Sequence, residues 1–125
     1  MVQQQPARSA ALDNLFHALA DPTRRAMLQS LAGGQRNIGE LAAPHRMSFA
    51  AASKHVRVLE AAGLVKRKIE GRAHLCRIDP SILRMAEKWI GDRRAAWEHH
   101  LDRLGEFLAE QEAETRRAEP KRRKP

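Results

Sequence analysis

The side chains with the clearest chemistry in this sequence are the lysines and arginines of residues 54–77. Seven of them stand in this stretch against two glutamates, which leaves a formal charge of +5. They are interleaved with apolar residues, so they belong to a folded surface. The whole chain is also basic, with a net charge of +8. Such a surface attracts a polyanion, either nucleic acid or an anionic membrane surface. The chemistry to expect is therefore the binding of anionic groups, not bond cleavage.

Catalytic and metal-binding motifs are missing from the sequence. It has no glycine-rich phosphate loop, no nucleophile elbow and no Cys or His set at metal-binding spacing. His99 and His100 are adjacent, so on a helix they point about 100° apart and cannot chelate one ion together. The lone Cys76 excludes an intrachain disulfide, and we interpret it as a buried structural thiol rather than a redox switch. We predict no enzymatic activity, no cofactor and no metal site.

The first element that must position the basic side chains is a helix over residues 48–63. Ser48 is a suitable N-cap, and Gly63 is a suitable terminator. The apolar residues of this segment share one face of the helical wheel: Ala52, Val56 and Leu59. Lys54 and Arg57 lie on the opposite face among small residues. One side of this helix is thus predicted to be buried, and the other to face a ligand.

A basic β-hairpin is predicted directly after this helix. Residues 64–69 and 73–78 are rich in β-prone types, and residues 70–72 (EGR) suit a tight turn between them. The alternation leaves open which face of each strand is buried, because Leu75 and Ile78 fall on opposite faces.

Three shorter helices are predicted earlier in the chain. The apolar face of the first consists of Leu12, Leu15, Phe16 and Leu19. The second starts at Asp21 and Pro22, which suit an N-cap and a first helical turn. Its inward residues are Met27, Leu28 and Leu31. The third opens with the capping box of Asn37 and Glu40. The third and fourth helices form a helix-turn-helix, and the hairpin adds a wing.

A long helix over residues 81–112 follows the hairpin. Its distal part carries apolar residues at spacings of four, three and four: Trp97, Leu101, Leu104 and Leu108. This seam suits a partner helix, so we predict a homodimer. Leu12, Leu15 and Phe16 are expected to add to the dimer interface.

The two ends of the chain lack the periodicity of its middle. Residues 1–10 are predicted to be a flexible arm, and residues 113–125 a basic disordered tail. The fold expected over residues 11–112 is mainly α with a small β-hairpin. It is a winged helix-turn-helix with five helices, the last of them long and used for dimerisation.

Five segments form a specific pattern when they are taken together. They are residues 19–25 (LADPTRR), 38–42 (IGELA), 53–65 (SKHVRVLEAAGLV), 70–72 (EGR) and 79–80 (DP). Over residues 11–80 the sequence therefore resembles the ArsR-type winged helix-turn-helix regulators. The resemblance implies a bacterial homodimer that pairs through its first and last helices and binds an operator as a repressor. It does not extend to metal sensing. The third-helix sensors of that family carry Cys-x-Cys, and residues 39–44 contain no cysteine. The fifth-helix sensors carry Asp-x-His and His-x-x-Glu, which the last helix also lacks.

The predicted function is sequence-specific binding of double-stranded DNA by a homodimeric transcriptional repressor, at a palindromic operator. The residues expected at the DNA are Ser48, Phe49, Ala51, Ser53, Lys54, Arg57, Lys68, Arg72 and His74. Phe49 would contact a thymine methyl group or pack beneath the turn. His74 would contact phosphate or pack within its strand. The sequence identifies no effector.

Two other functions use the same basic surface. One is a protein-interaction module in which the wing and last helix bind a partner protein, and the other is sequence-blind DNA binding. No apolar run of 18 residues and no signal peptide is evident, so we expect a cytoplasmic protein without a membrane partner.

Overall fold

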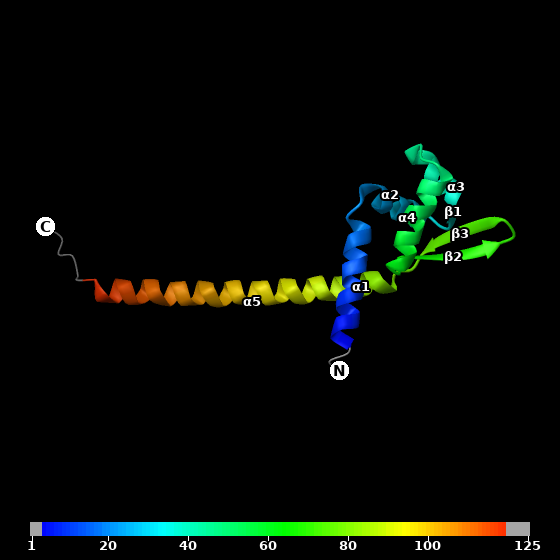
Figure 1. Ribbon diagram of the computed structural model, residues 1–125. Helices are drawn as coiled ribbons and strands as arrows, with labels where there is room; N and C mark the ends of the chain where they lie inside the picture. Colours follow the sequence, from blue (N-terminus) through cyan, green and yellow to red (C-terminus); the bar gives the residue numbers. More distant parts are fainter. Residues whose placement is uncertain (1–3, 120–125) are drawn as a thin grey trace. The chain divides into compact units, whose positions relative to one another are not determined.

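The computed structural model describes residues 4–119, with side chains from Arg8 onward. Its elements, shown in Figure 1, are α1 (Gln4–Leu19), α2 (Pro22–Leu31), β1 (Arg36–Asn37), α3 (Ile38–Ala42), the 3-10 helix η1 (Ala43–His45), α4 (Phe49–Ala61), β2 (Val65–Glu70), β3 (Ala73–Ile78) and α5 (Ser81–Ala118). The chain divides into two units, the first ending at Glu87 and the second starting at Lys88. Helix α5 contributes to both. The fold is the predicted winged helix-turn-helix.

Three helices start where their capping residues predict. The Asp21 carboxylate accepts a hydrogen bond of 2.9 Å from the backbone N–H three residues later. Asn37 and Glu40 form a complete capping box, with hydrogen bonds of 2.8 and 3.1 Å. The Ser48 hydroxyl accepts a bond of 3.1 Å at the start of α4. Each side chain satisfies a backbone donor that the helix itself cannot pair.

The core of the first unit is made of aliphatic and sulfur-containing side chains. Its buried members are Leu15, Ala18, Met27, Leu28, Leu31, Ile38, Leu41, Ala42, Ala52, Val56, Leu59, Ala62, Leu64, Val65, Cys76 and Ala86. The inward residues predicted for α2 and for α4 are all among them, so both predictions are confirmed. Because one face of α4 is fixed in this core, its opposite face is held toward solvent.

The sheet has three antiparallel strands in the order β1-β3-β2. The predicted hairpin is confirmed, and Gly71 in its turn has a φ of 58°, which glycine adopts without strain. Arg67 lies opposite the buried Cys76, so these two residues and Ile78 share the face toward the core. Leu75 points to the other face. The register thus settles the question that the alternation left open. Strand β1 was not predicted, because two residues carry no periodicity.

Both ends of the described chain are more helical than predicted. Helix α1 begins at Gln4, so the expectation of an irregular arm over residues 1–10 is wrong for residues 4–10. Gln, Ala and Arg favour helix, and Pro6 falls in the first turn, where no N–H partner is lost. Helix α5 runs to Ala118, so residues 113–118 are not disordered. Adding residues to an existing helix avoids the nucleation penalty, even without apolar side chains. The rest of the predicted arm and tail lies outside the described residues.

None of the helices in the described part combines the length and apolar composition needed to cross a membrane.

Candidate nucleic-acid interface

The outward face of α4 carries the predicted basic side chains. Lys54 and Arg57 are both exposed, opposite the buried face of the same helix. Phe49 in the first turn is 60% exposed, so it does not pack beneath the turn. Ser48 is exposed and Ala51 is half-buried. The first two turns of α4 thus offer one aromatic ring, small side chains and the cation Lys54, and Arg57 follows in the third turn, which suits entry into a major groove.

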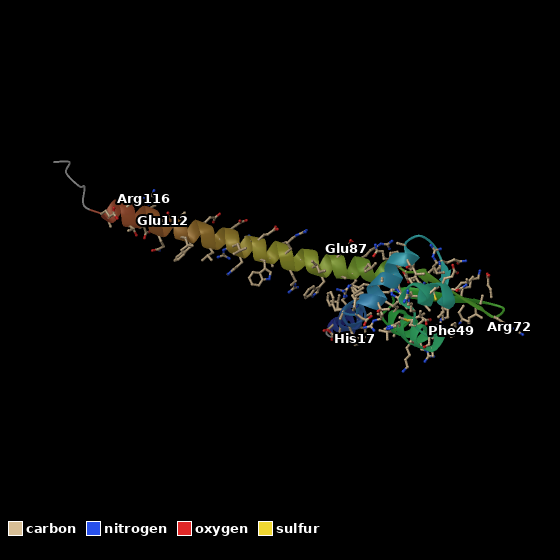
Figure 2. The ribbon with its side chains drawn as sticks, turned by 90° about the horizontal axis from the view of Figure 1, so that it is seen from above. His17, Phe49, Arg72, Glu87, Glu112 and Arg116 are labelled. Carbon is tan, nitrogen blue, oxygen red and sulfur yellow. The ribbon has the colours of Figure 1, made fainter. Side chains whose placement is uncertain are left out.

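The wing brings a further cation beside the start of α4. Arg72 follows the turn glycine and is exposed. Figure 2 shows Phe49 at the start of α4 and Arg72 at the tip of the hairpin. Both line one groove of about 260 Å³. Lys68 is also exposed, but its Nζ lies 2.8 Å from a carboxylate oxygen of Glu70. An exposed pair of this kind is weak, so Lys68 remains available to a phosphate.

Two predicted contact residues, Ser53 and His74, are partly engaged within the fold. Ser53 is only 8% exposed, so it offers little surface to a base edge. Its position at the edge of the α4 wheel turns it toward the core. The Nδ1 atom of His74 lies 3.0 Å from Nη1 of Arg67, and the ring is half-buried. His74 also lines the groove with Phe49 and Arg72, so its two considered roles, phosphate contact and packing within the strand, are both compatible with its position.

Arg67 connects the helix-turn-helix to the wing, and sequence reasoning did not single it out. Its Nη2 donates a hydrogen bond of 2.6 Å to Oε1 of Glu60 on α4, and the arginine side chain is only 16% exposed. Its other contact is His74 on β3. One guanidinium thus joins α4, β2 and β3. In the sequence Arg67 lies between two lysines, and nothing in the pattern of residues distinguishes it from them.

A second arginine fixes the other side of α4. Arg24 donates to the carbonyl oxygens of Ala18 and His17 at the end of α1, at 2.8 and 3.0 Å. Its Nη1 also lies 3.4 Å from Nδ1 of His55 on α4. This side chain adds donors at the C-terminus of α1, where the His17 carbonyl also accepts a hydrogen bond of 3.2 Å from the backbone N–H of Ala20. Arg24 and Arg67 therefore both act in positioning α4.

The predicted dimer residues fall into two groups. Leu15 is fully buried within its own chain, so its assignment to a dimer interface is wrong. A helical wheel shows which face is apolar but not which molecule covers it. Leu12 also packs against the core, whereas Phe16 is 40% exposed. The exposed large hydrophobic residues in the described part of the second unit are Trp89, Ile90, Trp97, Leu101, Leu104, Phe107 and Leu108. All of them lie on α5.

Cys76 is a buried thiol in strand β3. Burial raises the pKa of this thiol above its ordinary value, although the positive charge of Arg67 acts in the opposite direction. We expect Ellman's reagent to modify Cys76 in the native protein at least about 100-fold more slowly than in guanidinium chloride, because the reaction needs an exposed thiolate. The time course of absorbance under both conditions measures this. Equal rates would mean that the thiol is accessible in the native state.

Among residues 4–119, no group of three or more His, Cys, Asp or Glu side chains is placed to hold a metal ion.

Comparison with known proteins assigns the helix-turn-helix unit to a family. Residues 19–68 match the family model of a helix-turn-helix domain. The crystal structure of the ArsR family transcriptional regulator RHA00566 is 36% identical to this chain, with a TM-score of 0.69. The match covers 72% of this chain and 93% of that one. The chain belongs to the ArsR family. It is therefore a transcriptional regulator with a DNA-binding winged helix-turn-helix domain.

Other bacterial transcriptional regulators extend the similarity. The HTH-type transcriptional regulator Rv2034 of Mycobacterium tuberculosis is 41% identical over 69 residues, which are 55% of this chain and 64% of that protein. The chain thus matches less than two thirds of that regulator's length. The transcriptional repressor SdpR of Bacillus subtilis is 28% identical over 79 residues, or 63% and 88% of the two chains. The homodimeric DNA-binding domain of Mb0332 from Mycobacterium bovis is 26% identical, with a TM-score of 0.59. That match covers 71% of this chain and 84% of that one.

Proposed function

We propose that this ArsR-family protein is a homodimeric repressor that recognises a palindromic DNA operator. The observation that carries the proposal is the outward face of α4, where Phe49, Lys54 and Arg57 are exposed. The wing cation Arg72 lines the same groove as Phe49. A helix of this kind reads base edges in the major groove, and a wing binds the adjoining backbone or minor groove. The proposed DNA contacts are Ser48, Phe49, Ala51, Lys54, Arg57, Lys68 and Arg72, with smaller parts for Ser53 and His74.

The homodimer is supported by the apolar seam of α5. Trp97, Leu101, Leu104 and Leu108 recur every three or four residues, which keeps them on one helical stripe. Large apolar side chains on an isolated helix gain free energy when a second helix covers them. Two copies related by a twofold axis would present two α4 helices, and two half-sites about 34 Å apart make a palindrome.

The repressing role is supported by the similarity to SdpR, which is a transcriptional repressor, and the dimer by the homodimeric domain of Mb0332. A repressor needs only to occupy its operator, so the surfaces described above suffice for this mechanism.

Selection of bound fragments from random double-stranded DNA tests the proposal. We expect a consensus with inverted-repeat symmetry and a half-site spacing of about one helical turn. Enrichment without a consensus would favour sequence-blind binding, and no enrichment would favour a protein-interaction module. Either of these outcomes would contradict the proposal.

A further inference from the structure

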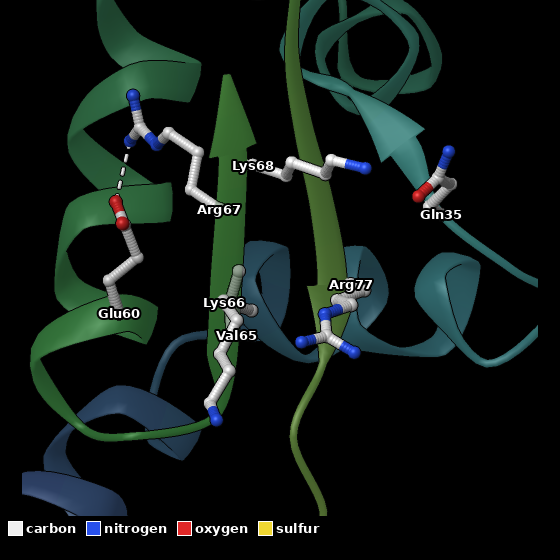
Figure 3. Close-up of a pocket in the computed structure, with 7 residues that line it drawn as sticks. All are labelled: Gln35, Glu60, Val65, Lys66, Arg67, Lys68 and Arg77. Atoms are coloured by element: carbon white, nitrogen blue, oxygen red, sulfur yellow. Dashed lines mark hydrogen bonds and ion pairs between the residues drawn. The ribbon is translucent and has the colours of Figure 1, made fainter. Parts of the chain in front are cut away.

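A cationic hollow of about 730 Å³ lies on the wing sheet, away from the groove that Phe49 and Arg72 line. Its lining residues, drawn in Figure 3, are Gln35, Glu60, Val65, Lys66, Arg67, Lys68 and Arg77. Four of the seven are lysine or arginine, and the one carboxylate is already bound to Arg67. The hollow therefore presents a surplus of positive charge to whatever enters it.

The positive charges of the hollow are available to a ligand. Arg77 is exposed and takes part in no ion pair within the described residues. Lys66 lies 3.5 Å from Asp79, and Lys68 lies 2.8 Å from Glu70, but both lysine side chains are more than 60% exposed. Exposed pairs of this kind contribute little free energy, so a stronger anion can replace them.

A second observation concerns Arg67, which is the most buried cation in the wall. Its Nε atom is buried and has no hydrogen-bond partner in the described part of the chain. Its two terminal nitrogens are held by Glu60 and His74. Figure 3 shows the side chain reaching from β2 to Glu60 on α4. By the strand register this side chain lies on the core face of the sheet, whereas Lys66, Lys68 and Arg77 lie on the other face. Arg67 therefore fixes β2 against α4 and leaves these three cations to meet an anion.

Three lining residues of the hollow, Glu60, Lys66 and Arg77, lie near the ends of α4 and of the hairpin that are distant from Phe49 and Arg72, and Lys68 is the lining residue shared with the proposed DNA contacts. Glu60 is in the last turn of α4, about 16 Å along the helix axis from Phe49. Lys66 and Arg77 face each other at the base of the hairpin, about 16 Å along the strand from the turn at Gly71. A phosphate of the DNA that contacts Phe49 and Arg72 would therefore not reach this pair at the same time.

We propose that this hollow binds a small organic anion carrying carboxylate or phosphate groups, and that the anion is an effector of the regulator. The volume falls in the range of small-molecule sites, and separated cations favour a ligand with two or more negative groups. The effector role rests on the proposed DNA-binding function. The anion would neutralise Lys66, Lys68 and Arg77 and so lower the positive potential that attracts DNA.

Isothermal titration calorimetry of the full chain tests the site without DNA. The probes are citrate for the carboxylate class and pyrophosphate for the phosphate class, in buffers matched in ionic strength with sodium chloride. We expect at least one probe to bind with 1:1 stoichiometry per chain. Arg77→Gln should weaken that binding about 10-fold or more, because it removes a charge-assisted hydrogen bond. Lys66→Gln is a second variant in case the first misfolds.

Arg84→Gln is the matched control, because Arg84 is an exposed arginine of α5 outside the hollow. It should leave the affinity unchanged. Absence of binding for both probes, or an equal loss in Arg84→Gln and Arg77→Gln, would overturn the proposal, since the attraction would then be diffuse.

Measurements of DNA affinity identify whether the anion is a free small molecule or a DNA phosphate. If the ligand is a free anion, the Arg77→Gln variant has the DNA affinity of the wild type in anion-free buffer. Adding the probe then lowers the DNA affinity of the wild type but not that of the variant. If the hollow instead takes a DNA phosphate, Arg77→Gln weakens binding to all DNA sequences, reduces the salt dependence, and neither probe binds. That result would contradict the effector role. Failure of the chain to bind any DNA would contradict the proposed function, while the calorimetric result would still decide the site.

Discussion

Replacing both Leu101 and Leu104 with aspartate is expected to convert the protein into monomers and to remove high-affinity operator binding. Both leucines are about half exposed on α5, which fits residues that a second copy covers. Burial of one leucine side chain contributes about 1.5–3 kcal/mol, and a symmetric dimer would lose four of them. The dimer should therefore weaken by more than about 1,000-fold. Sedimentation equilibrium measures the dimer, and fluorescence anisotropy with operator DNA measures binding.

The control for this double variant is His99→Asp combined with Arg103→Asp. These residues are exposed on the opposite side of the same helix. The control variant therefore introduces two carboxylates, as the test variant does, but leaves the apolar seam unchanged. The control should remain dimeric. A wild-type protein that sediments as a folded monomer at micromolar concentration would contradict the dimer itself. Circular dichroism separates dissociation from unfolding in the seam variant.

The helix starts and the wing turn could be predicted because their causes are local. A capping side chain acts on a backbone group two or three residues away, so Asp21, Asn37 and Ser48 mark their helices in the sequence itself. Gly71 marks the turn for a similar reason, since its positive φ is a property of one residue. The buried face of α4 follows from periodicity over a single helix.

Features that depend on several elements at once could not be predicted. Arg67 looks like its lysine neighbours in the sequence, and only the strand register turns it toward Glu60 and the buried Cys76. Leu15 and Leu101 are both apolar residues on helical faces, yet one is buried by its own chain and the other is exposed. Strand β1 exists only because β3 lies beside it. Each of these outcomes is decided by tertiary packing.

Some of the candidate DNA contacts could be predicted from the sequence, and others could not. The outward direction of Lys54 follows from the wheel of α4 alone, so it could be predicted. Ser53 lies at the edge of the same wheel, where a small rotation decides between exposure and burial, and it is buried. The partner of His74 could not be foreseen, because it depends on how β2 and β3 pair.

Changing Lys54 to alanine is expected to reduce sequence discrimination, whereas changing Arg72 to alanine should reduce affinity for all sequences. Lys54 lies in the second turn of α4 on its exposed face, within reach of a guanine edge. Loss of a good base contact removes about 1–3 kcal/mol of discrimination, or roughly 5- to 150-fold in the ratio of specific to nonspecific affinity. Arg72 follows the wing turn, where a phosphate or the minor groove is the nearest ligand. Its loss should lower the slope of log affinity against log salt by about one unit and leave the ratio nearly intact.

Titrations of operator and scrambled DNA at three or more salt concentrations separate these two effects. Arg84→Ala provides the control, because it removes an exposed cation of the first unit outside both α4 and the wing. It should change neither the ratio nor the slope by a comparable amount. All three variants replace exposed side chains, so circular dichroism should show wild-type folding. Unchanged operator affinity and discrimination in Lys54→Ala would mean that α4 does not read the bases. If Arg72→Ala reduced sequence discrimination instead, the wing would be the element that reads the bases. The roles assigned to α4 and to the wing would then have to be reversed.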